Sequence, residues 1–172
     1  PADGLRCWGL NDEGQLGDRT WDDSTIPVHV VDVLASGVSD LDAGHHHTCA
    51  LTSGGRVMCW GKNDSGQLGN GTFEDSNVPV FVQGLTGITT SIHTGADFTC
   101  AVSNAGRVSC WGNNSTGQLN DGTTENRNVA VLTDPELIAG IKMISGGEKE
   151  IQGVTANGGT SFWNTEPIIP VT

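Results

Sequence analysis

Cys59-Trp60-Gly61 decides the fold, because the same signature recurs along the chain. It returns as Cys7-Trp8-Gly9 and Cys110-Trp111-Gly112, and in altered form as Phe162-Trp163-Asn164. Successive tryptophans of the four copies are 52, 51 and 52 residues apart. A signature repeated at one period of this length is typical of a repeat protein.

Outward from Trp60, each copy has the same order of short segments. A polar loop leads to Gly66-Gln67-Leu68, and a β-branched run follows at 78–82. A further apolar run at 88–93 precedes Thr99-Cys100-Ala101-Val102. Gly, Asn, Asp and Ser clusters bound these runs, and no segment sustains a helical period. Four strand-sized runs in about fifty residues predict one four-stranded blade of an all-β propeller.

The complete motif closely resembles the repeats of the regulator of chromosome condensation family. It reads His-Thr-Cys-Ala-Leu at 47–51, Gly-Gly-Arg-Val at 54–57 and Cys-Trp-Gly-x-Asn-x-x-Gly-Gln-Leu-Gly at 59–69. The likeness extends from Leu5 to Thr172, and it implies a seven-bladed β-propeller. We expect a single repeat array over 1–172, with about three blades plus a partial one, as part of a larger or multi-chain propeller. The repeats are approximately 5–55, 56–106, 107–159 and a partial 160–172.

Both ends of such an array need a cover, because a short stack of blades exposes apolar faces and open strand edges. The last copy has 7 residues from Trp163 to Pro170, where Trp60 to Pro79 spans 19. It lacks the Gly-Gln-Leu loop, as a closing segment would. At the other end, we expect the strand at 5–9 to be completed by a segment outside this chain, either removed sequence or a neighbouring copy.

Four cysteines flank two expected hairpin turns. Cys49 and Cys59 are equidistant from one turn centre, and Cys100 and Cys110 from the next. Residues facing each other across an antiparallel pair lie ~4.5–5.5 Å apart, within reach of a disulfide. In the next copy we match these positions to Ile151 and Phe162, so that both cysteines are lost together, as bonded partners would be. The spacing therefore favours two disulfides within hairpins over buried free thiols.

Disulfides indicate an oxidising compartment, so we expect an extracellular or cell-surface protein. The hairpin partner of Cys7 would lie before Pro1, which leaves Cys7 unpaired or bonded to another molecule. No apolar run approaches the ~18 residues of a membrane span.

The chain is strongly acidic, with 8 basic and 20 acidic residues and a net charge of -12. This charge argues against binding nucleic acid or an anionic membrane. It also weighs against the best-known role in the family, guanine-nucleotide exchange on a small GTPase at chromatin. Many acids fall in the repeated loops, such as Asp22-Asp23 and Glu74-Asp75. We interpret them as a solubilising surface, with calcium binding as a weakly supported alternative, because no stretch has a calcium loop's ligand spacing.

Nothing in the sequence predicts an enzyme. Consecutive strand residues alternate between faces, so His45, His46 and His47 cannot all reach one metal ion, and we assign His47 a structural role. No nucleophile motif or phosphate-binding glycine loop is present. We predict no catalytic residue, no cofactor and no metal.

Two sets of recurring residues complete the predicted sites. The tryptophans next to glycine are expected to be structural, with Trp60 and Trp111 buried between blades. Several asparagines fit the N-glycosylation pattern, although tight turns also favour asparagine. The structural set is Trp8, Trp60, Trp111 and Trp163, and the possible glycosylation sites are Asn63, Asn70, Asn113 and Asn114.

Two functions remain open. The first is a non-enzymatic, secreted or cell-surface module that mediates protein–protein interaction. The second is a structural subunit of an extracellular assembly or filament, completed by copies of itself. A binding module closes its ring within one long chain, whereas a subunit closes it with neighbouring copies.

Overall fold

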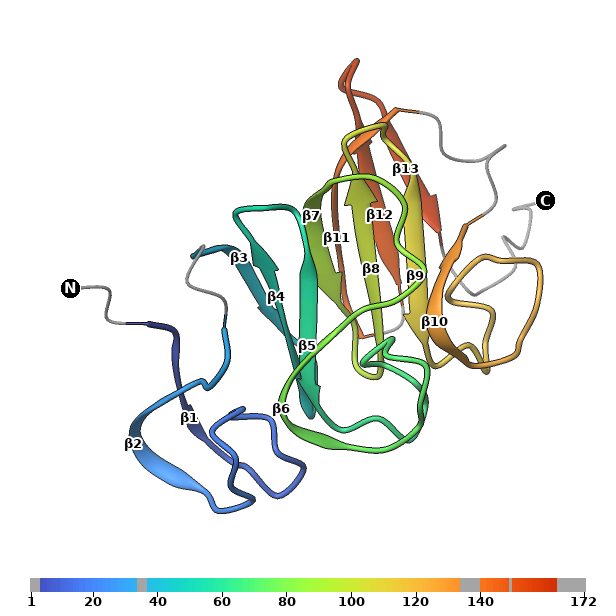
Figure 1. Ribbon diagram of the computed structural model, residues 1–172. Coiled ribbons are helices and arrows are strands. Elements are labelled where there is room, and N and C mark those ends of the chain that lie inside the picture. Colours follow the sequence, from blue (N-terminus) through green and yellow to red (C-terminus); the bar gives the residue numbers. More distant parts are fainter. Residues whose placement is uncertain (1–3, 34–36, 134–139, 149, 164–172) are drawn as a thin grey trace.

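The computed structural model describes residues 4–33, 37–133, 140–148 and 150–163, and these form thirteen β-strands (Figure 1). The first six are β1 (Arg6–Gly9), β2 (Ser24–His29), β3 (Val38–Ala43), β4 (His47–Thr52), β5 (Val57–Gly61) and β6 (Ser76–Phe81). The other seven are β7 (Thr89–Thr94), β8 (Phe98–Ser103), β9 (Val108–Gly112), β10 (Arg127–Leu132), β11 (Ile141–Gly146), β12 (Ile151–Thr155) and β13 (Thr160–Trp163).

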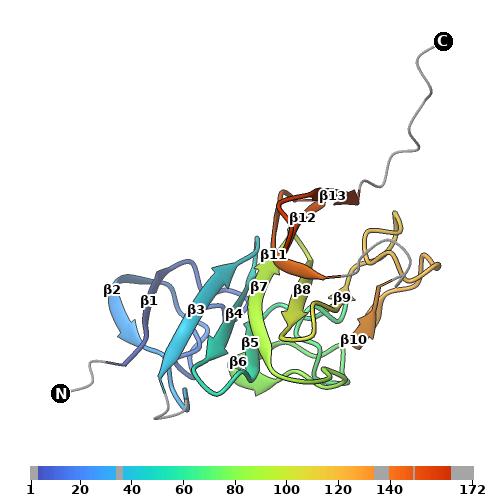
Figure 2. The ribbon, with the colours of Figure 1, turned by 90° about the horizontal axis from the view of Figure 1, so that it is seen from above.

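The strands form successive antiparallel sheets that follow the order of the chain. Two sheets are complete four-stranded blades, β3-β4-β5-β6 and β7-β8-β9-β10. The pair β1-β2 lies at one end, and the three strands β11-β12-β13 lie at the other. Figure 2 shows the sheets side by side, with β3, β7 and β11 next to one another. The predicted all-β array of four-stranded blades is confirmed.

Each sequence repeat contributes to two blades. The repeat at 56–106 supplies β5 and β6 to one blade, and β7 and β8 to the next. The chain between two cysteine-tryptophan signatures crosses from one sheet to its neighbour. Adjacent blades are therefore joined both by the continuous backbone and by side-chain packing.

Both predicted disulfides are present, Cys49–Cys59 and Cys100–Cys110. The bonded residues face each other in register across β4-β5 and β8-β9, with Cα atoms 4.1 Å apart in each pair. Each disulfide packs in the interface with the following blade: the first lies in one apolar cluster with Trp111, and the second in one with Ile151. The disulfides are therefore part of the cores between blades.

Of the two residues that we matched to the cysteines in the last blade, Phe162 was right and Ile151 was wrong by one position. The register pairs Ile151 with Trp163 and Gln152 with Phe162. Gln152 therefore stands where Cys100 stands in the preceding blade, and Ile151 stands at the position of Thr99. The two cysteines are still replaced together, but by an exposed polar residue and an aromatic one.

Trp60 and Trp111 lock one blade to the loop of the blade before it. Both are 0% exposed, as predicted. The Trp60 indole N–H donates to the main-chain carbonyl of Gln15 at 2.8 Å, and that of Trp111 donates to the carbonyl of Gln67 at 2.9 Å. Gly69, at φ +65°, lies against the Trp111 ring, and a Cβ there would come within 2.8 Å of it.

Trp8 has no such cover within the described residues, and its structural role stays a prediction. Trp8 is 64% exposed. Trp60 and Trp111 are buried by the loop of a preceding blade, and no described residue supplies such a loop to Trp8. The side chain of Trp163 lies outside the described residues.

Replacing Trp111 with alanine should destabilise the chain by ~3–5 kcal/mol, because it removes a large buried ring and an interblade hydrogen bond. Trp8→Ala is the matched control and should change the free energy of unfolding by only about 0.5 kcal/mol. Urea unfolding followed by circular dichroism measures both. Equal losses for the two variants would contradict the assigned interblade role.

Candidate interaction surface

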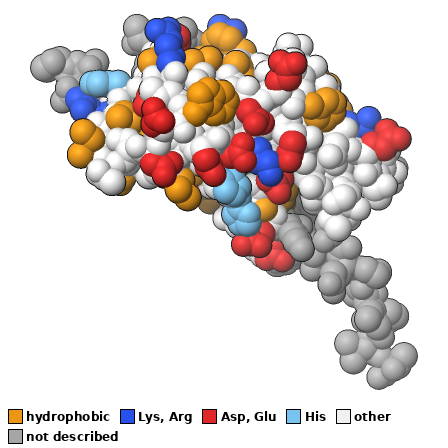
Figure 3. Space-filling model, turned by 90° about the horizontal axis from the view of Figure 1, so that it is seen from below, with side chains coloured by type: hydrophobic (Ala, Val, Ile, Leu, Met, Phe, Trp, Pro, Cys, Tyr) orange, Lys and Arg blue, Asp and Glu red, His pale blue; other side chains and the backbone are white. Residues whose placement is uncertain are grey.

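Three polar loops gather at one rim of the array. They connect the last two strands of successive blades, at residues 10–23, 62–75 and 113–126, which we call loops 1, 2 and 3. In Figure 1 they lie at the bottom of the molecule, and Figure 3 views that face. Acidic side chains are spread over the face, with basic side chains, histidines and hydrophobic side chains among them.

Each loop is built around one asparagine that is 0% exposed. In loop 2, Asn63 accepts a hydrogen bond from the Leu68 N–H at 2.9 Å. Its side-chain amide donates to the carbonyls of Thr72 at 3.1 Å and Glu74 at 3.0 Å. The same position, three residues after the tryptophan, is used in every loop. The three residues are Asn11, Asn63 and Asn114.

These bonds correct the glycosylation prediction at Asn63 and Asn114. A glycan is attached to the amide nitrogen, which in both residues is buried and already donates to the loop. Asn70 and Asn113 are partly exposed, and their glycosylation stays a prediction. The acceptor pattern is local, whereas the recurrence of asparagine at one place in each repeat was the available signal for a structural role.

Asn63→Asp should cost about 3 kcal/mol of stability, because it turns a buried donor into an oxygen that faces two carbonyl oxygens. Asn157→Asp, at an exposed turn, is the control and should be close to neutral. Thermal unfolding at neutral pH compares the two. Near-identical midpoints would contradict the role given to the buried amide.

Loops 1 and 2 form a continuous surface. The Arg19 N–H donates to the Asn77 carbonyl at 3.0 Å, just after loop 2. Gly14, at φ +78°, lies so close that a Cβ would be 2.7 Å from the Asn77 Cα. Burial, followed by the neighbouring carboxylate of Asp75, raises the pKa of Glu13. Carboxylates from two blades therefore repel one another on this surface.

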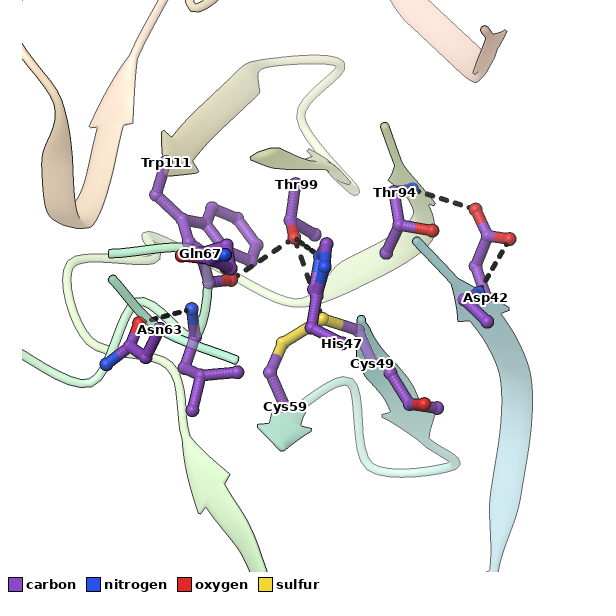
Figure 4. Close-up of a disulfide and its surroundings, with 12 residues drawn as sticks. Asp42, His47, Cys49, Cys59, Asn63, Gln67, Thr94, Thr99 and Trp111 are labelled. Carbon is purple, nitrogen blue, oxygen red and sulfur yellow. Dashed lines mark hydrogen bonds between the residues drawn. A yellow bond between two sulfur atoms is a disulfide. The ribbon is translucent and has the colours of Figure 1, made fainter. Parts of the chain in front are cut away.

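His47 lies between the second and third blades (Figure 4). Its Nε2 is 2.9 Å from the Thr99 hydroxyl, which also reaches the Gln67 carbonyl. Burial lowers the pKa of His47 to about 4. Phe98 and Ile151 occupy the equivalent positions one blade later, so an apolar pair there replaces a polar one.

His45 and His93 each lie beside an acidic side chain. His45 Nε2 lies 3.1 Å from Glu148, and His93 Nδ1 lies 3.2 Å from Asp42. Asp42 also accepts from the Thr94 N–H at 2.8 Å. In the described part of the chain, no group of three or more His, Cys, Asp or Glu side chains is placed to hold a metal ion.

Stability should fall by about 3 kcal/mol between pH 7 and pH 4 through His47 alone. The unfolded chain binds a proton near pH 6.5, but the folded chain binds it only near pH 4, so acid favours unfolding in this window. His47→Phe, which copies Phe98, should flatten the profile. Ile88→Ser, an exposed change that involves no titratable group, should leave it unchanged. A profile that His47→Phe does not alter would contradict the assignment.

Cys7 is free and half-buried, beside the apolar cluster of Val30, Ala50 and Trp60. Burial, with a smaller contribution from Asp18, raises the pKa of its thiol, which disfavours the reactive thiolate. A cleft of about 280 Å³ lies beside it, between β1 and the strands β3 and β4. The bond from Cys7 to another molecule stays a prediction.

Among the described residues, no helix is long and apolar enough to cross a bilayer.

Comparisons with known proteins agree with this architecture. Residues 6–51 and 54–102 match the family described as Regulator of chromosome condensation (RCC1) repeat. The human E3 ubiquitin-protein ligase HERC2 is 32% identical over 95% of this chain, which spans 3% of that protein.

Two solved structures share the fold. Human WBSCR16 superposes with a TM-score of 0.82 and 23% identity, over 95% of this chain and 43% of that one. Prp20p from Saccharomyces cerevisiae superposes with a TM-score of 0.76 and 18% identity, over 95% of this chain and 40% of that one. The chain therefore spans less than half the length of each of these relatives.

Proposed function

This chain belongs to the regulator of chromosome condensation (RCC1) repeat family, and from that premise we propose that it is a non-enzymatic protein-interaction module of a secreted or cell-surface protein. Prp20p, which shares the fold, is described by its binding to Gsp1p and histones. HERC2 is named as a ligase, but the 3% of it that this chain spans gives no basis for transferring that activity. The regular blades and polar loops supply a rigid surface suited to a protein partner.

The two disulfides are the observation that supports a secreted or cell-surface location. Two consecutive hairpins place cysteines directly opposite each other, and all four residues are buried in interblade cores. Reducing compartments keep such thiols reduced, whereas secreted and surface proteins retain disulfides.

The state of the thiols in the natural full-length protein tests this location. We expect Cys49, Cys59, Cys100 and Cys110 to resist alkylation in denatured, unreduced protein from its own cells, and to react after reduction. Surface biotinylation of intact cells should label the protein, or the medium should contain it. Free thiols in an intracellular protein would contradict the location.

The second function, a subunit completed by neighbouring copies, is favoured by the β1 edge. In the described residues β1 pairs with β2 alone. Trp8, Leu10 and Leu41 are exposed beside the cleft. Sedimentation over a range of concentrations separates the two functions: assembly that Trp8→Ser abolishes supports the subunit, and a monomer at all concentrations supports the binding module.

A further inference from the structure

Two exposed aromatic side chains occupy the same place in loops 1 and 2. Trp21 and Phe73 each lie 13 residues after the tryptophan of their repeat. Trp21 is 48% exposed and Phe73 is 51% exposed. Each is followed by two acids, Asp22-Asp23 and Glu74-Asp75. Loop 3 has Thr124 in the same position, so it offers a comparison within the chain.

The charges of the loops differ in the same way. Arg127 in β10 neutralises loop 3, with its guanidinium 2.7 Å from Asp121 and 3.9 Å from Glu125. Loops 1 and 2 are followed by serine at the position of Arg127. Within the described residues, Asp22 and Glu74 form no ion pair, although both are exposed. Loops 1 and 2 each carry a cation, but Lys62 pairs with Asp64 at 3.2 Å and Arg19 with Asp32 at 2.7 Å. Loops 1 and 2 therefore each combine an exposed ring with an adjacent carboxylate that has no ion pair, and loop 3 has neither.

In each pair of acids, the second carboxylate accepts a hydrogen bond within the loop, whereas the first carboxylate forms none. One carboxylate oxygen of Asp23 accepts the Asn11 N–H at 2.8 Å, and Asp75 accepts the Asn63 N–H at 2.6 Å. Asp22 and Glu74 take part in the loops through main-chain atoms: both carbonyls accept from the buried asparagine, and the Glu74 N–H donates to the Thr72 hydroxyl. Their side chains are available to a ligand.

We propose that loops 1 and 2 together bind an extended, basic peptide segment of a partner protein, with Arg or Lys side chains on Trp21 and Phe73 and ion pairs to Asp22 and Glu74. This inference rests on the proposed function as a protein-interaction module and names the chemistry of its partner. Cations are attracted to the faces of aromatic rings, and carboxylates beside the rings add direct charge pairing. The chain uses the same contact internally, where the Arg56 guanidinium lies 3.6 Å from the centre of the Phe81 ring.

A basic peptide is favoured by the continuity of the surface as well as by its charge. Loop 1 packs on the start of β6, directly after loop 2, through Arg19 and Asn77, so the two loops that carry the rings lie on one rim. The net charge of -12 also draws a cationic segment toward the protein.

Fluorescence anisotropy with a labelled peptide of alternating Arg and Ser tests the proposal on this chain. A peptide with Glu in place of Arg is the control ligand. We expect binding of the Arg peptide that weakens as salt is raised, and no binding of the Glu peptide. The double variant Trp21→Ser/Phe73→Ser should weaken binding about tenfold. Ile88→Ser, which removes an exposed hydrophobic residue outside the loops, should not.

Charge variants complete the test. Asp22→Asn/Glu74→Gln keeps the main-chain acceptors of both loops and should weaken binding about tenfold, whereas Glu150→Gln, outside the three loops, should have no effect.

Three results would overturn the inference: no binding of the Arg peptide, equal binding of the Glu peptide, or loss with the charge variant but not with the aromatic one. The proposed function would survive each of them, because thiol protection and surface labelling test its location independently, and another rim could bind a different partner.

Discussion

The hydrogen bond from each buried tryptophan to the main chain of the preceding loop is the interaction on which the rest of the structure depends. Trp60 and Trp111 bind the carbonyls of Gln15 and Gln67. Those carbonyls are held in place because Asn11 and Asn63 organise the loops from within. One buried amide thus fixes a loop, the loop anchors the next blade, and the anchored loop presents its outer side chains on the rim.

The interfaces between blades keep this frame while their other contacts vary. His47 and Thr99 form a polar contact between the second and third blades, and Phe98 and Ile151 replace both members one blade later. A buried histidine left beside an apolar partner would lose a hydrogen bond, so the two positions change together. The disulfides occupy the same interfaces and limit how far each hairpin can adjust.

The architecture could be predicted from the sequence because the same local pattern of strands and turns occurs in several copies. The strand runs, the turn glycines and the facing cysteines are all local, and the structure has them where they were predicted. The error at Ile151 arose where the cysteines that mark the register are absent, and it moved the match by one residue. The glycosylation prediction at Asn63 failed for another reason: the acceptor pattern covers three adjacent residues, whereas the amide is buried by hydrogen bonds to residues farther along the loop.

The rim combines constraints of opposite kinds. Its inner asparagines, Asn11, Asn63 and Asn114, are buried and hydrogen-bonded to several parts of their loops, which fixes the loop backbone. Its outer side chains in loops 1 and 2 include the exposed rings of Trp21 and Phe73 and the carboxylates of Asp22 and Glu74, which form no ion pair within the described residues. A fixed backbone that presents exposed rings and unpaired carboxylates is the arrangement expected of a binding surface. Because the loops are already ordered, little conformational entropy is lost when a partner binds.

Hydrogen exchange of the indole N–H groups, followed by NMR, tests the interblade bond most directly. Trp60 and Trp111 should exchange only through global unfolding, whereas the exposed Trp8 and Trp21 should exchange at rates close to those of an open chain. Exchange of Trp60 and Trp111 as fast as that of Trp8 would show that the tryptophans do not hold the blades together.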